Sequence, residues 1–255
     1  MNLMKSARTS GKDHYRLLYQ SELEKEAEWL RRGAGHKVNS IELLLSRNSI
    51  KPKTLLELGC GTGAVITECQ RRNLSERYVA VDYAPEAIDY LRKHSTGIEP
   101  IQGDITDPTF RLNRPCDVVI LSHVLEHLED PAGFLAALRS SLKFTHAIIE
   151  VPLEDLAISK LKAVLKDRRA SKAGHVQFFT PHTLEHLLKA SGFRISDTRR
   201  YIPVLDMETI RFACDKNRMG RRQRFLMACT GNYLPRMLNP LWQRLYYAHY
   251  AVLCK

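Results

Sequence analysis

Paired cysteines are absent from the sequence. The six cysteines lie far apart, and no two of them have the C-x-x-C spacing of a structural zinc site or a redox motif. This pattern argues against a disulfide framework and is typical of the reducing cytosol, so we expect a cytoplasmic protein. Hydrophobic residues make up 44% of the chain. That share is enough for a sizeable core and argues against disorder.

Long apolar runs are also absent. No segment approaches the roughly 18–20 apolar residues that a membrane-spanning helix needs. Residues 1–12 are polar and lack the apolar region of a secretory signal, which predicts that the protein is not secreted. The sequence shows no internal repeat and no low-complexity tract. Its 255 residues suit one α/β domain with some additions.

Acidic residues are outnumbered by basic ones. The chain carries 39 Lys and Arg against 28 Asp and Glu, a net charge of +11. Such an excess favours nucleic acid, an anionic membrane surface or an acidic substrate as partner, although a merely basic surface fits equally well. The positive charge is concentrated in residues 160–172 and 211–224. RNA therefore stays open as a partner.

Short apolar runs alternate with helical stretches from residue 54 onward. The predicted strands are residues 54–58, 77–82, 98–102, 117–121, 146–151, 193–201 and 245–253, and the helices between them are residues 64–72, 85–93, 131–142 and 180–190. Runs that are apolar throughout are typical of parallel strands buried on both faces. The alternation predicts an α/β fold with a doubly wound, mostly parallel, seven-stranded sheet.

Helices are expected before the sheet. Residues 1–50 form a predicted helical cap, with one helix that Gly33 and Gly35 end and a second that follows them. Tyr15 and Tyr19 of the first helix either cover a ligand or simply pack. The remaining residues, 51–255, form the predicted ligand-binding domain. We expect insertions into this domain at about residues 153–174, as a helical lid, and at about residues 203–244.

A glycine-rich turn follows the first predicted strand. The spacing from Gly59 to Ala64 satisfies the dinucleotide pattern G-x-G-x-x-G/A, so an NAD site is one interpretation. Glycines let a ligand approach the main chain at the helix N-terminus. Glu57, at the end of the strand, can meet the cationic amino-acid end of a ligand, and Gly63 adds a third glycine. These two features favour S-adenosylmethionine (SAM) over NAD.

The segment Glu57-Leu-Gly-Cys-Gly-Thr-Gly63 resembles the first motif of class I SAM-dependent methyltransferases, and later segments resemble the family's further motifs in order. The resemblance covers about residues 36–202. It implies a Rossmann-like methyltransferase fold with SAM as cofactor. The residues that it implies for cofactor binding are Glu57, Gly59, Cys60, Gly61, Gly63, Asp82, Tyr83, Asp104, Ile105, Ser122 and His123.

The resemblance also implies individual roles. Asp82 ends the second predicted strand, where a carboxylate accepts hydrogen bonds from both ribose hydroxyls, and Tyr83 lies along the adenine. Asp104 resembles the acid that takes the adenine amino group, with Ile105 packed on the ring. Either aspartate alone would most often be a helix cap or a solvated turn. Both, however, follow successive strands at one edge of one sheet. Ser122 and His123 are expected near the methionine part of SAM.

The segment from His123 to His127 matches H-x-x-E-H, a pattern of inverted zinc peptidases. Here it follows a strand in a methyltransferase-like sheet, so we interpret the match as coincidence. The segment also resembles the Glu-x-x-Glu-His stretch of ubiquinone-pathway O-methyltransferases, which use a divalent metal. The chain departs from that stretch at its first position, where His123 replaces a carboxylate. Because hard cations prefer oxygen ligands, we expect no metal site.

Two histidines are candidate general bases. His123 is expected near the methyl group, and His175 precedes a segment that borders the substrate pocket in similar enzymes. His123 fits equally well as a histidine that packs on the cofactor without taking a proton. His127 is expected to be structural.

The expected activity is methyl transfer to a small-molecule acceptor, at an oxygen of a sugar, lipid-linked or quinone-like compound. The acceptor is anionic or lipid-linked if residues 153–172, where apolar and basic residues alternate, form a lid or lie on a membrane. An ordinary solvated helix explains that alternation as well. Two alternatives are an RNA methyltransferase and a non-catalytic module that binds SAM or a nucleotide.

Overall fold

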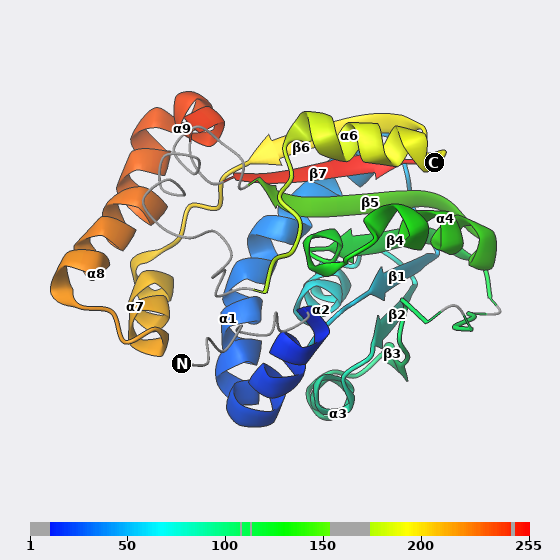
Figure 1. Cartoon of the computed structure of the whole chain (residues 1–255), viewed down its shortest axis with the longest axis horizontal. Helices are drawn as coiled ribbons and strands as arrows, with labels where there is room; N and C mark the ends of the chain where they lie inside the picture. Colours follow the sequence, from blue (N-terminus) through cyan, green and yellow to red (C-terminus); the bar gives the residue numbers. More distant parts are fainter. Residues whose placement is uncertain (1–10, 108, 113, 154–173, 246–247) are drawn as a thin grey trace, which may run out of the picture.

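The computed structural model describes residues 11–107, 109–112, 114–153, 174–245 and 248–255. One seven-stranded sheet crosses the molecule in the order β3-β2-β1-β4-β5-β7-β6 (Figure 1). Its strands are β1 (Thr54–Leu58), β2 (Arg77–Asp82), β3 (Ile98–Gln102), β4 (Cys116–Ser122), β5 (Phe144–Leu153), β6 (Ile195–Tyr201) and β7 (Ala248–Cys254). The first five pair in parallel, and β7 runs antiparallel to β5 and β6. The predicted doubly wound, mostly parallel sheet is confirmed.

Helices cover both faces of this sheet. The helical segments of the described residues are α1 (Gly11–Arg47), α2 (Ala64–Arg71), α3 (Pro85–His94), η1 (Leu125–His127), α4 (Pro131–Ser141), α6 (Pro181–Ala190), α7 (Met207–Lys216), α8 (Arg221–Ala228), η3 (Cys229–Tyr233) and α9 (Leu234–Leu245). One core contains side chains of α1, α2 and α3, and the other contains side chains of α4 and α6. Adjacent strand residues such as Leu55 and Leu56 enter opposite cores, because side chains alternate along a strand.

The N-terminal helix departs from the sequence prediction. Gly33 and Gly35 do not end it: α1 continues to Arg47, and its kink lies earlier, at Glu22 (φ −141°, ψ 33°). A glycine inside a helix costs only about 1 kcal/mol relative to alanine. The second half of α1 buries Ile41 and Leu44 against the sheet. Burial of those two side chains outweighs the cost of the glycines.

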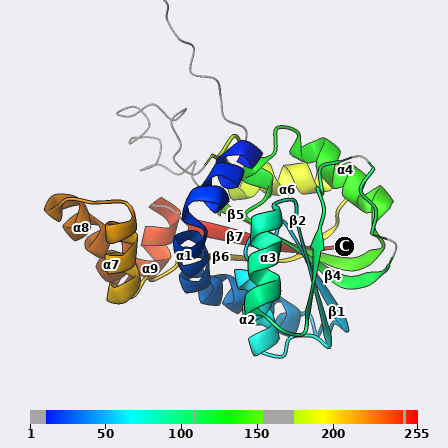
Figure 2. The same ribbon diagram turned by 90° about the horizontal axis from the view of Figure 1, so that it is seen from below.

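The segment between β6 and β7, where the sequence predicts an insertion at about residues 203–244, contains four described helical segments, α7, α8, η3 and α9, which lie at one end of the molecule beside α1 (Figure 2). Ion pairs of Lys216 with Glu26 and of Glu208 with Arg32 join α7 to α1. None of the described helices has the length and apolarity to cross a membrane. Most of the predicted lid insertion, residues 154–173, lies outside the described residues.

Candidate active site

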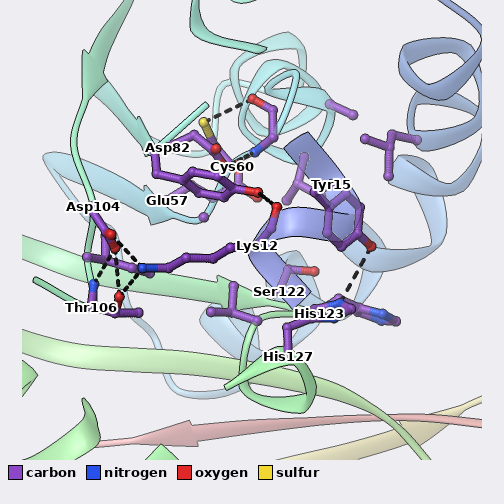
Figure 3. Close-up of a pocket in the computed structure, with 18 of the residues that line it drawn as sticks. Lys12, Tyr15, Glu57, Cys60, Asp82, Asp104, Thr106, Ser122, His123 and His127 are labelled. Atoms are coloured by element: carbon purple, nitrogen blue, oxygen red, sulfur yellow. Dashed lines mark hydrogen bonds and ion pairs between the residues drawn. The ribbon is translucent and has the colours of Figure 1, made fainter. Parts of the chain in front are cut away.

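A cavity opens at the carboxyl ends of β1, β2, β3 and β4, and α1 lies over it (Figure 3). All of the predicted cofactor-binding residues except Gly63 line this cavity. Tyr15, Tyr19 and Lys37 of α1 line it as well. The carboxyl edge of a parallel sheet is where α/β proteins bind ligands, because loops from successive strands meet there.

Gly61 and Gly63 of the turn have different structural roles. Gly61 has φ +53°, a conformation that favours glycine, and a Cβ atom there would lie 2.6 Å from the Tyr19 hydroxyl oxygen, so a larger residue would strain the turn and displace the Tyr19 side chain of α1. Gly63 precedes α2 with φ +78°, and a Cβ there would lie 2.4 Å from Leu91 of α3. Gly63 therefore permits packing of α3 and does not face the cavity.

Glu57 is a buried acid whose carboxyl group forms no ion pair with any described residue. The side chain is 2% exposed, and its Oε2 accepts a hydrogen bond of 2.9 Å from the backbone N–H of Ile66. Burial raises the pKa of Glu57 to about 8, although the charge of Lys37 and the hydrogen bond from Ile66 oppose this shift. A cationic group entering the cavity would therefore find a partner in the ionised form of Glu57.

Asp82 joins the end of β2 to the glycine turn. Its Oδ2 accepts a hydrogen bond of 2.7 Å from Gly61 N–H, and its Oδ1 accepts one of 3.0 Å from Ala84 N–H. Burial raises its pKa. Each carboxylate oxygen has two lone pairs, so both oxygens keep acceptor capacity for hydroxyl groups of a ligand. The structural role and the ligand-binding role are thus compatible at this residue.

Asp104 contacts the N-terminal helix. Figure 3 shows the Lys12 side chain extending along the cavity toward Asp104 and Thr106. The Lys12 ammonium lies 2.5 Å from Asp104 Oδ2, and Thr106 donates to Oδ1 from its N–H and its hydroxyl group. Burial opposes ionisation of Asp104, but these hydrogen bonds outweigh it and lower its pKa. Lys12 and Thr106 were missed in the sequence because no motif contains them.

His123 lines the cavity, but its ring nitrogens point to interior groups. Its backbone has φ +60°, which is uncommon outside glycine. Nε2 lies 3.0 Å from Nδ1 of His249, and Nδ1 lies 3.3 Å from Oε1 of Glu126. Because both nitrogens face these partners, the geometry disfavours His123 as the base that takes a proton from an acceptor.

A second histidine has the more suitable geometry. His127 Nδ1 lies 3.2 Å from the carbonyl oxygen of Gly174, and Nε2 lies 3.5 Å from the Tyr15 hydroxyl group at the cavity wall. Burial lowers the pKa of His127, so the neutral ring is favoured. If Nδ1 donates to Gly174, the Nε2 lone pair points to the Tyr15 hydroxyl group at the cavity wall, and the hydroxyl group of a ligand that replaced this contact could donate to Nε2. His175 packs edge-on against His127, with ring centroids 4.9 Å apart, and is not among the cavity-lining residues.

Beside the cavity lies a buried polar cluster that the sequence analysis did not identify. Glu150 of β5 and His249 of β7 are 3% and 7% exposed and surround the inner side of the His123 ring. Burial opposes ionisation of Glu150, but hydrogen bonds from the two histidines outweigh it and lower its pKa. Burial lowers the pKa of His249 to about 4. The one signal in the sequence was a charged residue, Glu150, inside the otherwise apolar run from Ala147 to Val151.

The sequence model of a family described as "Methyltransferase domain" matches residues 26–198, more than half of the chain. The chain belongs to this family of SAM-dependent methyltransferases. It is 29% identical over 159 residues to the mitochondrial ubiquinone biosynthesis O-methyltransferase of Schizosaccharomyces pombe, a match that covers 58% of this chain and 54% of that relative. The chain thus spans about half the length of that relative.

Two further matches cover a larger share of this chain. The ubiquinone biosynthesis O-methyltransferase of Hydrogenovibrio crunogenus is 24% identical over 209 residues, which cover 77% of this chain and 85% of that relative. The crystal structure of magnesium protoporphyrin IX methyltransferase from Synechocystis, with bound SAH, superposes with a TM-score of 0.56 at 15% identity, over 97% of this chain and 95% of the other. The fold and the SAM cofactor inferred from the sequence are confirmed.

Proposed function

We propose that this methyltransferase transfers the methyl group of SAM to an oxygen of a small-molecule acceptor. The observation that carries the proposal is the position of His127 at the cavity wall, where its Nε2 lies 3.5 Å from the Tyr15 hydroxyl group and can serve as the proton acceptor that a hydroxyl acceptor needs. The names of two relatives, both O-methyltransferases, agree with this choice. A quinone-like or lipid-linked compound is our preferred acceptor, and a sugar is the other candidate.

The cavity residues fit SAM along its length. Glu57 would bind the amino group, Asp82 the ribose hydroxyls and Asp104 the adenine amino group. Ser122 supports this assignment, because its buried hydroxyl oxygen lines the cavity and has no hydrogen-bond partner among the described residues. A buried hydroxyl group without a partner is costly unless a ligand supplies one. Lys37, which also lines the cavity, would neutralise the cofactor carboxylate.

Little acid–base chemistry is required of the protein. SAM, when bound, supplies a methyl group on a good leaving group. Methyl transfer to the acceptor oxygen would leave SAH in the cavity, and His127 Nε2 would take the proton of the acceptor hydroxyl group. The chain therefore contributes alignment and one base. The Gly174 carbonyl stabilises the protonated ring through its Nδ1–H.

An exposed apolar surface at α8 and α9 favours an acceptor that resides in a membrane. Phe225 is 73% exposed and Met237 is 78% exposed, and the exposed Arg221, Arg222 and Arg236 lie near them in the sequence. Apolar side chains together with arginines suit an anionic bilayer surface. The membrane contact that the sequence predicted for residues 153–172 falls almost wholly outside the described residues. We propose that α8 and α9 provide such a contact.

Transfer of a labelled methyl group tests the proposal. Hydroxylated quinone precursors, sugars and purified tRNA are offered separately to the wild type and to His127→Ala. We expect label in the hydroxylated compound and a turnover about 100-fold lower in the variant, with SAM affinity within about threefold of wild type. Label in tRNA alone would contradict the proposal, and SAM binding without transfer to any of these acceptors would favour a non-catalytic module.

The same assay tests the membrane contact. With a hydrophobic acceptor in anionic vesicles, Phe225→Ser should lower turnover about tenfold, and with a water-soluble acceptor it should have no effect. Leu17→Ser is the matched control, because Leu17 is also an exposed apolar residue (60%) but lies on α1. An equal effect of both substitutions would argue against α8 and α9 as the contact.

A further inference from the structure

We propose that His123, Glu150 and His249, with Tyr201, bind a divalent transition-metal ion of the Zn²⁺ type. These residues come from four neighbouring strand ends. His123 follows β4, Glu150 lies in β5, Tyr201 ends β6 and His249 lies near the start of β7. The sheet brings them together, since Ser122 pairs with Glu150 and Tyr201 pairs with His249. This proposal is independent of the acceptor and replaces the expectation of no metal.

The distances between potential ligand atoms match a metal site. Nε2 of His123 lies 3.0 Å from Nδ1 of His249 and 3.4 Å from Oε1 of Glu150, and the last two atoms are 3.1 Å apart. In a tetrahedral zinc site with bonds of 2.0–2.1 Å, ligand atoms lie about 3.3 Å from one another. An ion about 2 Å from all three atoms therefore fits the observed triangle.

Hydrogen bonding alone explains the cluster poorly. Nδ1 of His249 lies within 3.3 Å of three polar atoms: His123 Nε2, Glu150 Oε1 and the Tyr201 hydroxyl oxygen. A ring nitrogen has one proton or one lone pair, so it can satisfy one directed partner at a time. The Tyr201 hydroxyl lies 2.9 Å from the same Oε1 of Glu150. An ion at the centre would satisfy the convergent atoms together.

The surroundings of His123 support this assignment. A histidine that binds a metal through one ring nitrogen commonly donates its other N–H to a carboxylate. Nδ1 of His123 lies 3.3 Å from Oε1 of Glu126, a fully buried side chain whose two carboxylate oxygens have no hydrogen bond of good geometry among the described residues. Glu126 is thus placed to orient His123. Glu126 would be a positioning residue.

The donor set selects the class of ion. Two imidazole nitrogens with a carboxylate and a phenol oxygen suit Zn²⁺ and similar transition metals, whereas Mg²⁺ and Ca²⁺ prefer oxygen ligands only. A second group, Glu126, His127 and His175, also gathers potential ligand atoms. That group includes the segment that resembles the metal-using ubiquinone-pathway enzymes, so it serves here as the internal comparison and not as the proposed site.

Metal titration of the full chain tests the proposal. Protein freed of metal by a chelator is titrated with Co²⁺, followed by its visible absorption, and with Zn²⁺ by calorimetry. We expect one equivalent to bind, with an affinity at least about 100-fold lower in His249→Gln and Glu150→Gln, since even residues outside the ligand shell change affinity about 10–100-fold. His175→Ala should stay within about threefold of wild type. Circular dichroism and SAM binding verify that each variant folds.

A second measurement avoids substitutions in the buried cluster. X-ray absorption of the Zn²⁺-loaded His175→Ala variant should show two imidazole ligands, oxygen ligands and no sulfur. Three results would overturn the proposal: no stoichiometric binding by the wild type, binding unaffected by His249→Gln, or binding lost in His175→Ala. The last result would place the ion at the second group.

Discussion

Two pairs of buried acids lie along one edge of the same sheet and behave in opposite ways. Glu57 and Asp82 accept hydrogen bonds from backbone N–H groups, and burial raises the pKa of both. Glu126 and Glu150 lie beside histidines, and the pKa of both is lowered, for Glu126 to about 2. Burial is common to all four side chains. The difference therefore comes from the partners that the fold supplies.

This contrast separates the two halves of the edge. On the half formed by β1 and β2, no described residue forms an ion pair with the two acids, which suits the entry of a ligand that carries hydroxyl and cationic groups. On the half formed by β4, β5 and β7, the folded chain itself supplies histidine side chains as partners for the two acids. His123 lies at the boundary, with its ring in the cavity wall and its nitrogens in the cluster.

The largest effect is expected from the acid that contacts the glycine turn. Asp82→Ala removes the proposed ribose acceptor together with the hydrogen bonds to Gly61 and Ala84. Loss of buried charge-assisted hydrogen bonds of about 3 kcal/mol corresponds to a SAM affinity about 100-fold lower, measurable by calorimetry. The demethylated product SAH should lose affinity to the same degree, because its ribose is unchanged.

A matched aspartate at the opposite edge provides the control. Asp117 lies near the start of β4 and accepts 2.8 Å hydrogen bonds from Lys53 and Thr54 N–H groups. Asp117→Ala removes a comparable pair of hydrogen bonds from backbone N–H groups, at a position outside the cavity. We therefore expect lower thermal stability and unchanged SAM affinity. Equal loss of SAM binding in both variants would mean that Asp82 acts only through the fold.

A smaller effect is expected as a pH dependence at Glu57. Because its pKa of about 8 lies above its ordinary value, the carboxyl group is neutral at pH 6 to 7, and binding of a cation there releases a proton. SAM affinity should therefore rise with pH by up to about tenfold per unit below pH 8 and level off above it. Glu57→Gln should bind SAM with the slope abolished. A flat wild-type profile would contradict the assignment of Glu57 to the amino group.

The free energy of unfolding should also depend on pH through Glu57, with the opposite sign to SAM affinity. The protonated form of Glu57 is favoured in the empty folded protein relative to the unfolded chain. This contribution to stability is present at low pH and is lost as pH rises toward 8. The shift should be absent from thermal unfolding of Glu57→Gln. Opposite slopes for stability and for SAM affinity would link both to the same carboxyl group.

The first half of the edge was predictable from sequence, but the second half was not. Glu57, Asp82 and Asp104 each lie at or just after the carboxyl end of a parallel strand, and these ends meet at one edge of the sheet. His249 instead lies near the start of β7, which runs antiparallel, at 126 residues from His123. No short-range spacing encodes that contact. The continuity of α1 was missed for a related reason. The burial of its second half against the sheet is a tertiary contact, and it outweighs the cost of the glycines in the helix.

The smallest effect is expected at the edge of the cavity, where Lys12 contacts Asp104. Their side chains are 40% and 38% exposed, so the ion pair contributes at most about 1 kcal/mol. The adenine amino group would compete with the Lys12 ammonium for Oδ2 of Asp104. Lys12→Met keeps the apolar stem and removes the charge, so SAM affinity should rise by up to about fivefold in calorimetry at low salt. High salt should reduce the difference, because it screens exposed charges. A strong loss of affinity would mean instead that the ammonium itself binds the cofactor, and Asp104 would then act through Lys12.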